Sequence, residues 1–298
     1  MFIILKTSDL ITKLKDKGIT FDLCNETDAM QFLNEHNYYV KVTAYKTNFF
    51  KHDNKYVGLD FMALKDLSTI DMHLKQWILS ASLSVEHSLK VNLLKDMEEK
   101  GLDDFNIVEH YLDKYPKILD EIKSRRNKPY VKNLLGKYKH PHYPIWVFLE
   151  VIPFGEFVNF YKYYCSEYTY DAFQEELLYK VRDIRNASAH NICVIHDLVN
   201  KSGFYNQDLV NMLDILLPNT KRRTIQNRLK NNSVQDFVSL LFAIDIVIKS
   251  NDLKNLYFKN LKKLFDERMP RDAYLYKSSP AINQMYEFCK DVIDNLCN

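Results

Sequence analysis

Hydrophobic positions recur every three or four residues between Asp66 and Glu99, which is the spacing of one face of an α-helix. The apolar positions of this stretch are Leu67, Ile70, Leu74, Trp77, Ile78, Ala81, Val85, Leu89, Leu93 and Leu94. Gly101 follows and is expected to end the helix. The pattern therefore predicts one long helix over residues 66–99.

Weaker periodic stretches on both sides predict further helices. They cover residues 7–17, 27–37, 108–122, 145–164 and 171–190. Ser8 is the expected N-cap of the first, and Pro116, Pro153 and Gly155 are expected to interrupt two others. Residues 37–52 are aromatic and β-branched, which also suits a strand; we favour a helix followed by a loop with a turn at 52–55.

Residues 123–144 are basic and are expected to form a loop or a frayed region. After Gly203 we expect two or three more helices, with boundaries at 217–219 and 269–271. Only 6 Gly and 8 Pro occur in 298 residues, too few for a turn-rich β-sandwich. There is no glycine-rich phosphate loop and no strand–helix alternation, so the sequence predicts an all-α fold.

Charge and cysteine usage limit the partners and the compartment. The net charge is only +2, so any binding of nucleic acid must come from a local patch. The cysteines are odd in number, 5, and form no C-x-x-C pair, which favours buried free thiols in a reducing compartment. Residues 1–6 do not resemble a signal peptide, and the apolar run 237–248 is too short to span a bilayer. We therefore expect a cytoplasmic protein without a membrane partner.

The segment Arg185-Asn186-Ala187-Ser188-Ala189-His190 carries the chemistry of interest. A guanidinium binds phosphate and stabilises charge that develops on it, while an imidazole transfers protons near neutral pH. This spacing occurs about once by chance in such a chain, and an exposed arginine beside a capping histidine is the structural alternative. Three small residues leave room for a phosphate, and Asn186 and His190 share a helix face. Arg185 lies further round, so either its long side chain reaches across or a symmetric dimer supplies the partner histidine.

This segment resembles the R-x4–6-H motif of HEPN ribonucleases, and other segments resemble the Abi-type branch of HEPN proteins, the abortive-infection family of phage defence. The resemblance covers about residues 25–200. It rests on Tyr38-Tyr39 with Tyr45 and Phe49-Phe50-Lys51, Tyr56 to Phe61, Ser84 to Lys90, Trp146 to Glu150, and Phe154-Gly155. Lys90 departs from the pattern, which prefers arginine there. Glu86 is a candidate partner for an arginine of the site, with a surface or core polar contact as the default expectation.

The resemblance implies a HEPN-like helical bundle that forms a homodimer and cleaves RNA without a metal or cofactor. It assigns His190 as general acid or base, Arg185 as the group that stabilises the phosphorane, and Asn186 as the residue that positions one of them. Residues 1–200 would form the Abi-like core, and residues 201–298 a helical extension packed on it. RNA is then the substrate, and the expected restraint is an antitoxin protein, a small RNA or a closed conformation.

The densest basic region lies between residues 123 and 143 and is interleaved with aromatic residues, which suits single-stranded RNA. The candidate RNA-binding residues are Arg125, Arg126, Lys128, Lys137, Lys139 and Arg182. A solvated loop is an equally good explanation. His140 and His142 have no third ligand nearby in sequence, so no metal is expected.

Two further functions stay open from the sequence. One is a non-catalytic HEPN-type protein that binds RNA or acts as a scaffold. The other is a helical protein-interaction domain. Cleavage of RNA in the presence of a chelator separates the nuclease from both.

Overall fold

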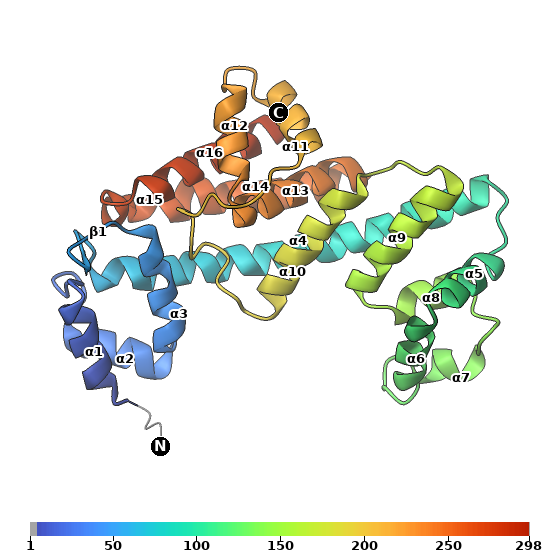
Figure 1. Cartoon of the computed structure of the whole chain (residues 1–298), viewed down its shortest axis with the longest axis horizontal. Coiled ribbons are helices and arrows are strands. Elements are labelled where there is room, and N and C mark those ends of the chain that lie inside the picture. Colours follow the sequence, from blue (N-terminus) through green and yellow to red (C-terminus); the bar gives the residue numbers. More distant parts are fainter. Residues whose placement is uncertain (1–4, 298) are drawn as a thin grey trace.

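A long central helix organises the molecule, which is a computed structural model that describes residues 5–297 (Figure 1). Helix α4 spans Phe61–Glu99, 39 residues, or about 58 Å. The Asp60 carboxylate accepts a hydrogen bond from the Met62 amide at 2.8 Å, so α4 begins five residues before the predicted start. Gly101, with φ of 63°, follows its end as predicted. The all-α prediction is confirmed, because the only sheet among the described residues is one two-stranded hairpin.

Small helices gather at the N-terminal end of α4. They are α1 (Thr7–Asp16), α2 (Glu26–Glu35), α3 (Tyr39–Ala44) and the 3₁₀ segment η1 (Tyr45–Asn48), followed by strands β1 (Lys51–His52) and β2 (Lys55–Tyr56). The helices predicted over residues 7–17 and 27–37 are present as α1 and α2, although Lys6 rather than Ser8 is the N-cap of α1. The expected turn is a tight hairpin, with Asp53 and Asn54 at positive φ, so part of the expected loop pairs as strands.

Short helices packed on aromatic side chains lie at the other end of α4 (Figure 1). They are α5 (Asn106–Lys114), α6 (Pro116–Ser124), α7 (Lys132–Lys137), α8 (Ile145–Val151) and α9 (Phe154–Tyr168). Pro116 starts α6, as the predicted interruption requires. The basic region contains α7 and is therefore not entirely a loop. Gly155 lies inside the first turn of α9, so the expected break occurs only at Pro153.

Helix α10 (Glu175–Ala189) carries the arginine–histidine segment and runs antiparallel to α9. Lys162 pairs with Glu175 at 2.8 Å, and further along the Tyr179 hydroxyl donates to Asn159 at 3.2 Å. The buried residues of α10 are Leu177, Leu178, Val181, Ile184 and Ser188. These side chains face α4 and α13, so the opposite side of α10 is left open toward its C-terminal end.

The C-terminal third adds more helices than the two or three expected. They are α11 (Gln207–Leu216), α12 (Arg222–Leu229), α13 (Asn232–Val247), α14 (Asn251–Lys263), the π-helical segment η2 (Leu264–Arg268), α15 (Met269–Arg271), the 3₁₀ segment η3 (Ala273–Tyr276) and α16 (Pro280–Leu296). The boundary at 217–219 is confirmed. The boundary at 269–271 is also confirmed, because the helical path through α14, η2 and α15 ends at Arg271, although Pro270 itself lies inside α15.

The C-terminal helices pack directly on α4. Trp77 donates a hydrogen bond to the Tyr257 carbonyl at 3.0 Å, and its ring lies 6.0 Å from that of Phe237. Asn92 likewise donates to the Val247 carbonyl at 3.0 Å. The division into a core of 1–200 and an extension of 201–298 stays a prediction.

The five cysteines are free, but only three are buried as expected, since Cys165 is half-buried and Cys297 is exposed. Residues 1–4, part of the segment considered for a signal peptide, lie outside the described residues. Within residues 5–297, every helix is either too short or too polar to cross a bilayer.

Candidate functional site

One face of α10 gathers the candidate catalytic residues at its C-terminal end. With about 100° per residue, Arg185, Ala189, Arg182, Asn186 and His190 follow one another round an arc of about 140°. The arginines and Asn186 are half-buried, whereas Ala189 and His190 are exposed. This face borders the buried stripe of the same helix on the side of Arg185, and the small side chain of Ala189 leaves it open.

Arg185 is held by two contacts that fix its guanidinium. Its Nη1 donates to the Asn186 side-chain oxygen at 3.0 Å, and its guanidinium carbon lies 5.9 Å from the centre of the Phe154 ring. Phe154 is the first residue of α9, where the helix dipole is positive and attracts an anion. The structure thus brings together the Arg185–Asn186 pair and the Phe154–Gly155 block, which are distant in sequence.

Arg182 lies one turn before Arg185, beside the same end of α9. Its Cδ lies 3.5 Å from the position that a Cβ on Gly155 would take, and its guanidinium carbon lies 4.9 Å from the centre of the Tyr179 ring. It also donates to the Asp183 carboxylate at 2.7 and 2.9 Å. Arg182 therefore approaches the site with part of its charge balanced by its neighbour.

His190 is the C-cap of α10, and its backbone amide donates to the Asn186 carbonyl at 2.9 Å. Its imidazole is exposed and, within residues 5–297, makes no hydrogen bond to Arg185 or Asn186. The Asn186 side chain thus contacts the arginine and not the imidazole. In one chain the guanidinium and the imidazole lie at opposite edges of the open face.

The segment after His190 is tied to α3 and α4 by two lysines. Asn191 has φ of 54°, a left-handed conformation that turns the chain away from α10. Lys75 donates to its side-chain oxygen at 2.6 Å, and Lys41 donates to its carbonyl. Lys75 also pairs with Asp71 at 2.7 Å in a nearly dry environment, since the two side chains are 8% and 0% exposed.

Asp71 extends this link to the backbone beyond Asn191. Its carboxylate accepts hydrogen bonds from the amides of Val194 at 2.8 Å and Ile195 at 3.1 Å. Burial beside this carboxylate also raises the pKa of the Tyr45 hydroxyl far above its ordinary value. The backbone that follows His190 is therefore fixed by a charged group inside the core.

Sequence reasoning missed Lys41, Asp71 and Lys75. Asp71 and Lys75 are four residues apart and adjoin Ile70 and Leu74 on the apolar stripe of the long helix. A pair of opposite charges inside a buried stripe is the signal that would have identified them, because buried charges need partners.

Glu86 and Lys90 form an ion pair at 2.9 Å, and Lys90 Nζ lies 5.6 Å from the centre of the Phe157 ring. Glu86 is half-buried and bonds to this lysine, so the default expectation of a polar contact is confirmed and the alternative pairing with an arginine of the site is not. The lysine that replaces the expected arginine thus bonds to a carboxylate on its own helix.

The basic region splits into one structural arginine and several exposed charges. Arg125 donates to the Val151 carbonyl at 2.8 Å and holds the junction of α8 and α9, close to Phe154. Arg126, Lys128, Lys137 and Lys139 are exposed. Figure 1 shows α6 and α7 well apart from the C-terminal end of α10, so these charges and His190 do not converge in one chain.

Among residues 5–297, no three histidine, cysteine, aspartate or glutamate side chains converge in a way that could hold a metal ion. His140 stacks edge-on with Tyr143, with ring centres 6.5 Å apart. His142 is exposed.

Comparison with known families places this site in context. A family model described as Abi-like protein matches residues 31–196, more than half of the chain. The match begins in α2, contains α10 with its arginine–histidine segment, and ends in the loop that Asp71 holds. No curated protein and no solved structure matches the chain significantly. The chain therefore belongs to the family of Abi-like proteins, whose name points to abortive-infection defence.

Proposed function

We propose that this protein is a metal-independent endoribonuclease of the HEPN type, acting as a toxin in abortive-infection defence in the cytoplasm. The observation that carries the proposal is the open face of α10, where Arg185 is fixed by Asn186 and Phe154 while His190 is exposed at a rigid helix end. A guanidinium beside a helix N-terminus suits a phosphate, and an exposed imidazole suits proton transfer.

The reaction would use the RNA's own 2′-hydroxyl. Its oxygen forms a bond to the adjacent phosphorus, the bond from phosphorus to the 5′-oxygen breaks, and the products are a 2′,3′-cyclic phosphate and a 5′-hydroxyl. His190 takes the 2′-hydroxyl proton or donates one to the 5′-oxygen. Arg185 stabilises the charge on the phosphorane.

The two proton transfers and the separation of Arg185 from His190 both favour a homodimer. A twofold axis would place the histidine of one protomer beside the arginine of the other. Large apolar side chains flank the end of α10: Ile192 is 54% exposed and Val40, next to Lys41, is 69% exposed. Interfaces form on contiguous apolar patches, and these two side chains would contribute to one at the end of α10.

The test uses purified protein and a fluorescent single-stranded RNA in excess EDTA. Wild type should cleave it and leave cyclic phosphate ends, and H190A and R185A should each lose at least 100-fold in rate. H110A and R271A replace exposed residues on α5 and α15 and serve as matched controls with wild-type rates. Cleavage that survives H190A would contradict the assignment.

A non-catalytic RNA-binding role is the second candidate, favoured by the lack of contact between Arg185 and His190 within one chain. It predicts that wild type binds the RNA without cleaving it and that R185A weakens this binding. In either case a toxin needs restraint, and an antitoxin protein or a small RNA remains the proposed partner.

A further inference from the structure

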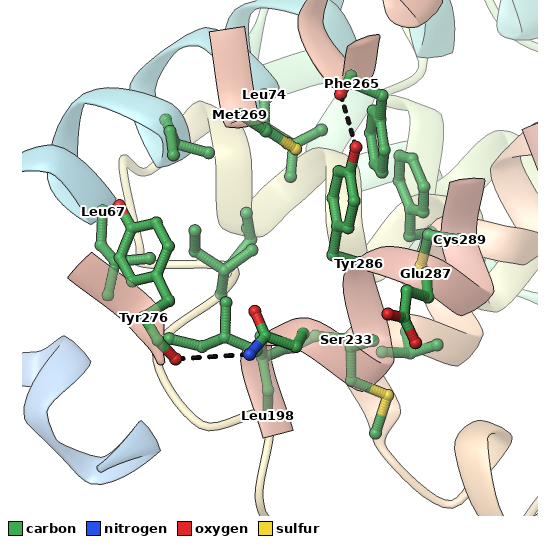
Figure 2. A pocket seen from close by; sticks show the side chains of 18 of the residues that line it. Leu67, Leu74, Leu198, Ser233, Phe265, Met269, Tyr276, Tyr286, Glu287 and Cys289 are labelled. Atoms are coloured by element: carbon green, nitrogen blue, oxygen red, sulfur yellow. Dashed lines mark hydrogen bonds between the residues drawn. The ribbon is translucent and has the colours of Figure 1, made fainter. Parts of the chain in front are cut away.

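An apolar cavity of about 240 Å³ lies between the central helix, the arginine–histidine helix and the C-terminal helices (Figure 2). Leu67, Ile70 and Leu74 of α4 form one wall. Ile184, the residue before Arg185, and Val194 of the following loop form a second. The cavity therefore touches both sides of the candidate catalytic segment while lying outside it.

Three parallel rings line the side contributed by the C-terminal helices. Phe237 stacks on Phe265 with ring centres 6.2 Å apart, and Phe265 stacks on Tyr286 at 5.7 Å. Phe265 belongs to the π-helical segment η2, and its carbonyl accepts the Tyr286 hydroxyl at 2.8 Å (Figure 2). Short π-helical segments are rare in proteins, and those that occur are often found at functional sites.

The two tyrosine hydroxyls in the walls already bond to the protein. The Tyr276 hydroxyl donates to the Asp66 carboxylate, as the Tyr286 hydroxyl does to a carbonyl. Burial raises the pKa of the Cys289 thiol to about 12, so the thiol is uncharged at neutral pH. A mostly apolar cavity of this size can take up apolar molecules.

Pro270, Ala273 and Glu287 are the exposed residues of the lining. Ser233 and Asn283, both half-buried, are hydrogen-bonding groups in the lining. The carboxylate of Glu287 repels an anionic head group, whereas the hydroxyl and amide accept a neutral one. An alcohol is therefore favoured over a carboxylate of the same chain length.

We propose that this cavity binds a small uncharged apolar molecule of roughly ten carbon atoms, scaled from benzene in an apolar cavity of about 150 Å³. The ligand would contact Val194 and Ile195, whose amides Asp71 holds, so binding would restrain the loop after His190. The site stands independently of the nuclease proposal, because it rests on the cavity alone.

The experiment titrates the full-length protein with 1-decanol and with decanoate, by calorimetry and by thermal unfolding. Decanol should bind saturably with one molecule per chain, raise Tm, and bind at least threefold tighter than decanoate. Hydrogen exchange at the Val194 and Ile195 amides should slow on addition of decanol. Absence of saturable binding, or uptake of many molecules per chain, would overturn the proposal.

Two variants connect the binding to this cavity. L74F fills part of the space and should weaken decanol binding at least tenfold, while L83F makes the same change at an exposed position of α4 and should bind as wild type. Wild-type affinity in a folded L74F protein would refute the site. E287Q changes only an exposed side chain, and it should bring the affinities for decanoate and decanol closer together; an unchanged ratio would contradict the role of Glu287.

Discussion

Lys75 Nζ lies 2.6 Å from Asn191 Oδ1 and 2.7 Å from Asp71 Oδ2, so one buried lysine connects the central helix to the residue after His190. Lys75 and Asn191 are more than a hundred residues apart in the sequence. It fixes the end of α10 against α4 with a charge that has almost no access to water. The exposed imidazole is thus attached to a backbone segment that cannot shift without breaking hydrogen bonds to the buried Lys75 and Asp71 side chains.

Replacing Lys75 should lower both the free energy of unfolding and the rate of RNA cleavage. K75M leaves Asp71 charged and unpaired in the core, and we expect a loss of about 3 kcal/mol in the free energy of unfolding. Urea unfolding measures it. K90M breaks the more exposed pair with Glu86 at the same spacing on the same helix and should cost about 1 kcal/mol or less. Equal losses in the two variants would contradict the role of Lys75.

Asn48 should be nearly as important for the loop. Its side chain donates to the Ile195 carbonyl at 2.9 Å and accepts from the Leu198 amide at 2.7 Å. N48A leaves both backbone groups without partners, and we expect a loss of about 2–3 kcal/mol together with faster hydrogen exchange at Leu198. N159A removes an exposed asparagine on α9 and should change stability by less than about 1 kcal/mol.

The oligomeric state should depend on the apolar residues beside α10. I192E and V40E place a charge in the proposed interface and should convert a dimer into a monomer in light scattering, with loss of RNA cleavage. I215E carries the same change at an isoleucine of α11 that is 84% exposed, and should remain dimeric. A strictly monomeric wild type that still cleaves RNA would refute the shared site.

Asp236 should make the protein less stable as pH rises. It lies on α13 with Lys180 at 3.8 Å, and burial raises its pKa to about 7, from an ordinary value of 3.8, with a smaller contribution from Asp183. The folded state therefore holds this proton more tightly than the unfolded chain does. The stabilisation is complete below about pH 4 and is lost as pH rises to about 7.

D236N removes this dependence on pH. Thermal unfolding should find the variant more stable than wild type at pH 8, by up to about 4 kcal/mol, and similar to it at pH 4. D113N changes an exposed carboxylate on α5 and should follow the wild-type curve. If D236N were stabilised more at pH 4 than at pH 8, the pH dependence of stability would have the opposite sign, which would exclude this account.

The sequence by itself determined the helices whose pattern is local. The apolar stripe from Leu67 to Leu94 specified α4, because a helix face repeats every 3.6 residues whatever it packs against. The local pattern likewise placed Arg185, Asn186 and His190 on one helix, which is α10 with its C-cap. The sequence pattern did not predict the start of α4 or the hairpin at 51–56, because a helix cap and a pairing of two residues per strand leave little periodic signal.

Tertiary structure alone decided what those residues touch. Phe154 lies under Arg185 because α9 folds back along α10, and Lys75 reaches Asn191 because the chain turns at the end of α10 onto α4. Contacts between such distant segments depend on how the helices pack, which no local pattern encodes. The same packing of α4, α10 and the C-terminal helices encloses the apolar cavity, which no single segment of the sequence predicts.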